Sequence, residues 1–298
     1  MNAGYAYRTR VGPAAHGQAI EHYLAVAYPH SSPAEWQARI DRGEIAIGGS
    51  RVERGAALRR GDEIVWSRPP WLEPDVPRHF DILLEDDDVL AVAKPSGLPT
   101  MPAGGFLTHT LLHLVRQQWP GADPVHRLGR ATSGVVLFAR SSAAAAALTK
   151  ELRERQVEKV YRALVAGAPD WSARDVTAPI GPVPHPRLGT VHAADPRGRA
   201  AHSHLAVVER RADTTLVEVR IATGRPHQIR IHLAWTGHPL AGDPLYGAGG
   251  VPSDAPGLPG EGGYHLHAWR VGFTHPRTTR PCTVTAPLPD PLRSATER

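Results

Sequence analysis

Short apolar runs of strand-like composition recur between about residues 80 and 290. Loops containing Gly and Pro separate these runs, notably at 179–199 and 247–263. Helical patterns are rarer in this region and fall near 108–118 and 141–154. Many strands with few helices predict an α+β domain around a largely antiparallel or mixed sheet. The predicted strands are Val89–Ala93, Val135–Phe138, Val160–Val165, Leu205–Val208, Thr215–Ile221 and Trp269–Phe273.

The first part of the chain follows a different pattern. Residues 1–10 form a polar lead, and 11–30 carry apolar residues at helical spacing. Ser32 predicts the cap of a second helix, with Pro33 at its first position and an end near Gly43. Two strand-like runs follow, at Glu44–Ile47 and Glu63–Trp66.

A proline-rich segment between residues 68 and 77 separates these two patterns and reads as a linker. A chain of 298 residues is expected to form one large domain or two ordinary ones. The predicted organisation is a small domain at 1–70, a linker at 71–79, a larger domain at 80–292 and a tail at 293–298.

The composition excludes several classes of protein. Hydrophobic residues make up 41% of the chain, which is enough for a sizeable core and excludes wholesale disorder. No apolar run approaches the roughly 18 residues of a membrane helix, and the N-terminus lacks an apolar signal core. Cys282 is the sole cysteine and excludes an internal disulfide. We therefore expect a cytoplasmic protein with no membrane partner.

The basic residues are almost all arginines. The formal net charge is +5, and only three of the 34 basic residues are lysines. Arginine suits planar, bidentate contact with phosphate, so the charge permits a nucleic-acid partner. A compositional bias is the alternative, because Ala, Gly and Pro are abundant as well.

Three segments carry candidate chemistry. The first, His126–Gly134, places arginines, a histidine and hydroxyls in a glycine-containing turn that could bind an anion. The second, Thr223–His232, mixes basic and apolar residues in a way that suits a functional role. The third, Lys159–Gly167, alternates as a strand and carries Tyr161. The structural alternatives are an ordinary turn, a basic surface element and a core tyrosine.

The seventeen histidines raise the question of a metal site. His109 and His113 have the i, i+4 spacing of zinc ligands, but Thr110 stands where a metalloprotease signature has Glu. Without a cysteine cluster or converging carboxylates, no metal site is predicted.

Taken together, the segments resemble the RluA-type family of RNA pseudouridine synthases over about residues 80–290. Val92–Pro99 resembles the family's first motif, and His126–Gly134 its catalytic loop. Lys159–Gly167 resembles its tyrosine strand, while Thr223–His232 and Gly242–Gly247 resemble its third motif. Tyr264–Ala268 matches a later strand. The N-terminal part resembles an S4-type RNA-binding module; the alternative is a small αβ domain of another purpose. In that module, the RNA-facing residues would be Arg51, Arg54, Arg59 and Arg60.

The resemblance implies an isomerase that converts uridine to pseudouridine in structured RNA (rRNA or tRNA) without a cofactor. The bond from C1′ to N1 breaks and C5 joins C1′, after the nucleotide has left its stack. Arg230 matches the active-site arginine and Tyr161 the tyrosine that contacts the base. A monomer is expected. Further residues that match the site and its RNA contacts are His126, Arg127, Arg130, Thr132, Ser133, Arg225, His227 and Gln228.

Position 129 departs from the family pattern. The family reads His-Arg-Leu-Asp, and this chain has Gly129 in place of the catalytic aspartate. Three interpretations stay open: Asp123 or Asp243 substitutes, the chain is a non-catalytic RNA-binding protein on a synthase scaffold, or glycine belongs to an active branch. Asp123 is a poor substitute, since three residues along a strand span roughly 10 Å and reverse the face. A carboxylate in reach of Arg230 and facing an open site would favour catalysis.

Overall fold

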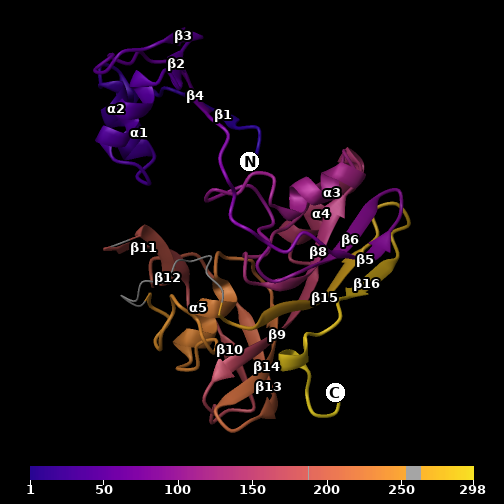
Figure 1. Ribbon diagram of the computed structural model, residues 1–298. Coiled ribbons are helices and arrows are strands. Elements are labelled where there is room, and N and C mark those ends of the chain that lie inside the picture. Colours follow the sequence, from indigo (N-terminus) through magenta and orange to yellow (C-terminus); the bar gives the residue numbers. More distant parts are fainter. Residues whose placement is uncertain (187, 253–262) are drawn as a thin grey trace. The chain divides into compact units, whose positions relative to one another are not determined.

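A computed structural model describes residues 1–186, 188–252 and 263–298, and the chain divides into two compact units, Met1–Glu73 and Pro74–Arg298 (Figure 1). Each unit has its own hydrophobic core. Within the described residues, no helix has the length and apolar character needed to cross a membrane.

The first unit packs two helices against a four-stranded sheet. Its elements are β1 (Tyr5–Arg10), a short 3₁₀ turn (Pro13–Ala15), α1 (Ile20–Ala27), α2 (Pro33–Asp41), β2 (Ile45–Ile47), β3 (Ser50–Arg51) and β4 (Glu63–Arg68), with sheet order β1-β4-β2-β3. Ser32 caps α2: its hydroxyl accepts from the Glu35 amide while the Glu35 carboxylate accepts from the Ser32 amide. The predicted second helix is confirmed. The resemblance to an S4 module stays a prediction.

The prediction of a polar lead at residues 1–10 is wrong, because Tyr5–Arg10 forms β1. This strand pairs antiparallel with β4 and places Tyr7 opposite Trp66. The two rings stack with their centres 5.1 Å apart. Cross-strand aromatic pairs of this kind stabilise a sheet even where the segment is exposed.

The second unit is built on a mixed sheet. In the described residues this sheet has ten strands, paired antiparallel except for β15 and β8, which run parallel. The predicted α+β class with a largely antiparallel sheet is confirmed. In spatial order the strands are β10 (Ala173–Val176), β13 (Ser203–Arg210), β14 (Thr214–Ile221), β9 (Glu158–Ala166), β15 (Leu266–Thr274), β8 (Ser133–Ala139), β6 (Val89–Lys94) and β5 (Asp81–Glu85), with β16 (Pro281–Thr285) beside β15 and β7 (Asp123–Pro124) beside β8.

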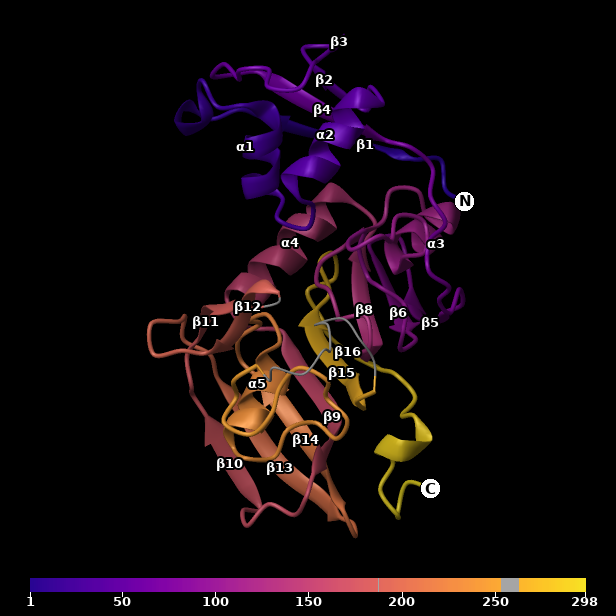
Figure 2. The ribbon, with the colours of Figure 1, turned by 60° about the vertical axis from the view of Figure 1, so that its left-hand side comes forward.

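Helices cover both faces of this sheet near β8 and β6 (Figure 2). Alternate residues of a strand face opposite sides, and β8 is apolar from Val135 to Ala139 because each face is buried in a different core. α3 (Leu111–Gln118) supplies Leu111 and Val115 to one core, beside Val136 and Phe138. α4 (Ser142–Arg153) supplies Ala144 and Leu148 to the other, beside Val135 and Leu137. The third α-helix of this unit in the described residues is α5 (Gln228–Trp235), and a short 3₁₀ turn (Asp290–Leu292) follows β16.

The predicted loop at 179–199 contains a β-hairpin instead, formed by β11 (Ile180–His185) and β12 (Gly189–Ala194). Pro182 and Pro184 masked the strand pattern. Proline is tolerated here because a two-stranded sheet has only edge strands. Of the other predicted loop, residues 253–262 lie outside the described residues. At the C-terminus, Glu297 pairs with Arg162 of β9 at 3.1 Å, so the predicted tail is held to the sheet.

Candidate active site around Arg230 and Gly129

The loop that follows His126 is held by the turn after β6. Thr100 is buried, and its Oγ1 donates to the Leu128 carbonyl at 2.9 Å while accepting from the Leu128 amide at 3.2 Å. Ser96 Oγ donates to the Ala131 carbonyl at 2.6 Å. The Gly97 amide donates to the Arg130 carbonyl at 2.8 Å. The Val92–Pro99 and His126–Gly134 segments therefore form one structure, in which hydrogen bonds set the path of the loop.

Lys94 lies beneath this loop and is 1% exposed. Its Nζ donates to the carbonyls of Pro95, Leu98 and Arg130 at 2.8, 2.6 and 3.1 Å. Burial lowers the pKa of Lys94 to about 7. However, only an ammonium has the three N–H donors that these carbonyls require together. Lys94 therefore clamps the loop.

Two of the predicted loop residues support the fold. The Leu137 amide donates to His126 Nε2 at 3.1 Å, and burial lowers the pKa of His126 to about 4. His126 is thus neutral and holds β8. Ser133 Oγ bonds His267 Nδ1 at 2.8 Å. Asp123 is ion-paired with Arg116 at an exposed position.

Arg230 is the central cation of the site. It lies on α5, is 3% exposed, and donates from Nε and Nη2 to the two carboxylate oxygens of Asp243 at 2.7 and 2.6 Å. The Asp243 side chain is 1% exposed and also accepts from the amides of Leu245 and Tyr246 at 2.9 and 3.1 Å. Although burial opposes it, this bidentate pair raises the pKa of Arg230. Asp243 orients Arg230 from the protein side and does not face an open site.

The start of α5 is fixed by two further residues. Gln228 is buried: its Oε1 accepts from Thr223 Oγ1 and the Arg225 amide at 2.7 and 3.0 Å, and its Nε2 donates to the His202 carbonyl at 2.9 Å. Gln228 therefore fixes the start of the helix, and its side chain is not part of an exposed surface.

His227 precedes this helix in the left-handed region at φ 56°, and its Nδ1 bonds the Tyr246 hydroxyl at 2.7 Å. The Tyr246 hydroxyl donates to the His192 carbonyl, so His227 Nδ1 is the donor to Tyr246. Burial, and then the nearby charge of Arg230, lower the pKa of His227 to about 4.

Tyr161 lies on β9 and is 8% exposed. It belongs to the same core cluster as Leu128, Ala131 and Tyr264. Burial raises the pKa of Tyr161 to about 12, so it keeps its phenolic proton at neutral pH.

The fold does not require glycine at position 129. A Cβ added there would lie 3.6 Å from Thr132 Oγ1 and 3.8 Å from Tyr264 Oη, both ordinary contacts, and the backbone is outside the left-handed region. The Tyr264 ring itself lies against Arg230, whose Cζ is 4.7 Å from the ring centre. Sequence reasoning placed Tyr264 only in a strand motif; its position just before a buried strand was the available signal.

The four predicted arginines of the first unit differ in their surroundings. Arg51 Nη2 donates to the Arg42 carbonyl at 3.2 Å, and Arg54 is paired with Asp41. Arg59 and Arg60 are exposed in the turn before β4. In the second unit, Arg225 Nε donates to the Ala200 carbonyl at 3.0 Å, Arg130 lies over the Phe106 ring at 5.5 Å, and Arg127 is exposed.

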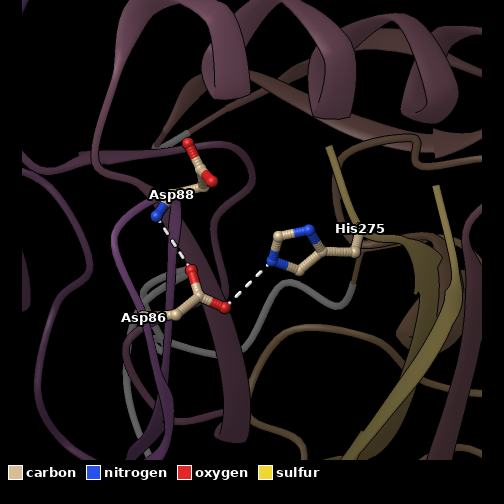
Figure 3. A group of neighbouring side chains, drawn as sticks. All are labelled: Asp86, Asp88 and His275. Atoms are coloured by element: carbon tan, nitrogen blue, oxygen red, sulfur yellow. Dashed lines mark hydrogen bonds and ion pairs between the residues drawn. The ribbon is translucent and has the colours of Figure 1, made fainter. Parts of the chain in front are cut away.

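A cluster of potential metal ligands lies elsewhere on the second unit (Figure 3). Asp86 accepts from the amides of Asp88 and Val89, both at 2.8 Å, and bonds His275 Nε2 at 2.9 Å. Arg277 pairs with Asp88. Backbone amides, His275 and Arg277 thus already bind the carboxylates of this cluster. These contacts connect the β5–β6 turn to the β15–β16 turn.

Comparisons with known proteins point to one family. The family model for RNA pseudouridylate synthase matches residues 88–235. An uncharacterized RNA pseudouridine synthase of Synechocystis is 41% identical over 273 residues, covering 91% of this chain and 94% of the relative. Ribosomal large subunit pseudouridine synthase D of Xylella fastidiosa is 34% identical, covering 97% and 91%.

Among solved structures, human RNA pseudouridylate synthase domain containing 1 has a TM-score of 0.58 at 24% identity, over 74% of this chain and 89% of that one. This likeness bears on the fold alone. The sequence relatives bear on the family, and the resemblance to RluA-type enzymes is confirmed by them. The chain belongs to the family of RNA pseudouridine synthases.

Proposed function

We propose that this chain isomerises uridine to pseudouridine in structured RNA, either ribosomal or transfer RNA, as a cytoplasmic monomer. The observation that carries the proposal is the buried Arg230–Asp243 pair beside the exposed position 129. Burying a bidentate ion pair removes the hydration of both charges, which costs free energy. This cost is offset in a site where the cation stabilises charge on a substrate. The relative from Xylella, named for the large ribosomal subunit, favours ribosomal RNA.

Each residue has a part in this proposal. Arg230 supplies a fixed positive charge in the site of the flipped-out nucleotide, where the departing uracil gains negative charge as the C1′–N1 bond breaks. Tyr161, protonated at neutral pH, contacts the base from the core side. The loop held by Lys94 and Thr100 presents Arg127 and Arg130 to the phosphates.

The second candidate function is RNA binding without chemistry. Gly129 favours it, since glycine provides neither a nucleophile nor a base. Asp123 and Asp243 do not replace the lost carboxylate in either function, because the first is paired with Arg116 and the second is enclosed behind Arg230.

Pseudouridine mapping of total RNA from cells with and without the gene separates the two functions. We expect at least one pseudouridine that disappears on deletion and returns with the wild-type gene, but not with Arg230→Met. The matched control is Asp123→Asn, which alters a carboxylate outside the site. An unchanged map contradicts the isomerase. Activity gained only by the Gly129→Asp variant favours the RNA-binding scaffold.

A further inference from the structure

We propose that Tyr264 is a catalytic residue of this site, whose hydroxyl contacts the ribose of the target nucleotide in the space where the family's carboxylate stands. The inference rests on the proposed isomerase function and concerns how a chain with Gly129 carries it out.

The first step of the argument is the position of the hydroxyl. Tyr264 Oη lies 3.8 Å from the point where a side chain at 129 would begin. A carboxylate is attached directly to the Cβ, so an aspartate there would place its oxygens in the immediate surroundings of this hydroxyl. Tyr264 thus brings a hydroxyl oxygen close to the region that the aspartate would fill.

The second step is access. Besides the adjoining residues, the described part of the chain places only Thr132 Oγ1 and Tyr264 Oη within 4 Å of that Cβ position. Gly129 is exposed. The open space at 129 is therefore lined by hydroxyls, and any larger side chain at 129 would cover them. Tyr264 as a whole is only 5% exposed, so glycine at 129 leaves its hydroxyl an opening that a larger side chain would close.

The third step is electrostatic. The Arg230 guanidinium lies 4.7 Å from the centre of the Tyr264 ring, and 4.9 Å from the ring of Tyr246 on another side. Arg230 thus keeps its positive charge against the face of the Tyr264 ring, whose hydroxyl can both donate and accept a hydrogen bond.

A double-mutant cycle tests the proposal with four full-length proteins: wild type, Tyr264→Phe, Gly129→Asp, and the two changes combined. The substrate is total RNA from cells lacking the gene. In the wild-type background, Tyr264→Phe should lower kcat about 100-fold with little change in KM, as expected for loss of one transition-state hydrogen bond. In the Gly129→Asp background the same change should cost less than about 3-fold, since the carboxylate then takes the place of the phenol oxygen.

The matched control is Tyr246→Phe. This change also removes a phenol oxygen from a ring that packs on Arg230, but that hydroxyl bonds His192 and His227 instead. Its effect should appear as lower stability, with the same fold-change of kcat in both backgrounds.

Three results would overturn the inference. Equal losses from Tyr264→Phe in both backgrounds would make Tyr264 a packing residue. Full activity of Tyr264→Phe in the wild-type background would also refute it, while leaving the proposed isomerase intact. If wild type forms no pseudouridine and Gly129→Asp does, both the inference and the active isomerase fail.

Discussion

At the scale of single residues, the Arg230–Asp243 pair has the largest energetic consequence, because both partners are almost fully buried. Arg230→Met leaves the Asp243 charge buried without its cation and should destabilise the fold by about 3–5 kcal/mol. Urea unfolding of the full chain measures this. The control is Asp123→Asn, which breaks an exposed pair and should cost less than about 1 kcal/mol. Similar costs for the two variants would contradict the strong coupling inferred here.

Three histidines make stability depend on pH. Burial lowers the pKa of His126, His227 and His267 to about 4, whereas an unfolded histidine titrates near pH 6.5. As the pH falls, protons bind the unfolded chain first, so stability is lost between about pH 6.5 and pH 4. Each histidine contributes up to about 1.4 kcal/mol per pH unit in that window. Melting temperatures at pH 7.5, 5.5 and 4.5 should fall in that order, and His267→Gln should flatten the trend. A constant melting temperature would refute the assignment.

At the scale of elements, the turn after β6 fixes the loop around Leu128. Thr100→Val removes both hydrogen bonds to the Leu128 backbone and keeps the shape of the side chain. Two buried backbone groups lose their partner, which should cost about 1–3 kcal/mol each. Hydrogen exchange of the Leu128 amide should accelerate markedly. Thr100→Ser retains the hydroxyl and should exchange nearly as wild type; equal acceleration in both variants would assign the effect to packing.

The elements also show how far sequence reasoning reaches. β8 was predictable because both of its faces are buried, which makes it apolar from Val135 to Ala139. β1 was missed because its stability comes from cross-strand partners on β4, such as Trp66 for Tyr7, which are distant in sequence. The β11–β12 hairpin was missed because Pro182 and Pro184 read as loop residues, although edge strands tolerate them.

The site was predictable in its parts and not in its pairings. Motif resemblance located Arg230, Tyr161 and position 129, because those residues keep their local spacing. The link from Arg230 to Asp243 joins a helix to a loop thirteen residues later, and the packing of Tyr264 on Arg230 joins separate elements. No local periodicity encodes such contacts, so the position of Tyr264 beside Arg230 could be identified only from the folded structure.

At the scale of the whole molecule, arginine is distributed over two compact units that each carry predicted RNA contacts. The proposed catalytic site lies in Pro74–Arg298, where the family model also matches. A separate unit that binds RNA would add affinity through phosphate contacts without touching the reacting base. The salt dependence of binding distinguishes the two contributions.

The exposed turn before β4 is the part of the first unit in which this contribution is testable. The double variant Arg59→Ala/Arg60→Ala should weaken binding of structured RNA and lower the slope of log K against log salt by roughly 1–2, because RNA binding then releases about one counterion fewer for each arginine removed. Arg54→Ala is the matched control, because Asp41 already neutralises that guanidinium, and its slope should change by less. Filter binding at salt concentrations from about 50 to about 300 mM measures the slopes of the double variant and of the control. If the double variant keeps the wild-type slope, the phosphate contacts belong to Pro74–Arg298 alone, and the small unit serves another purpose.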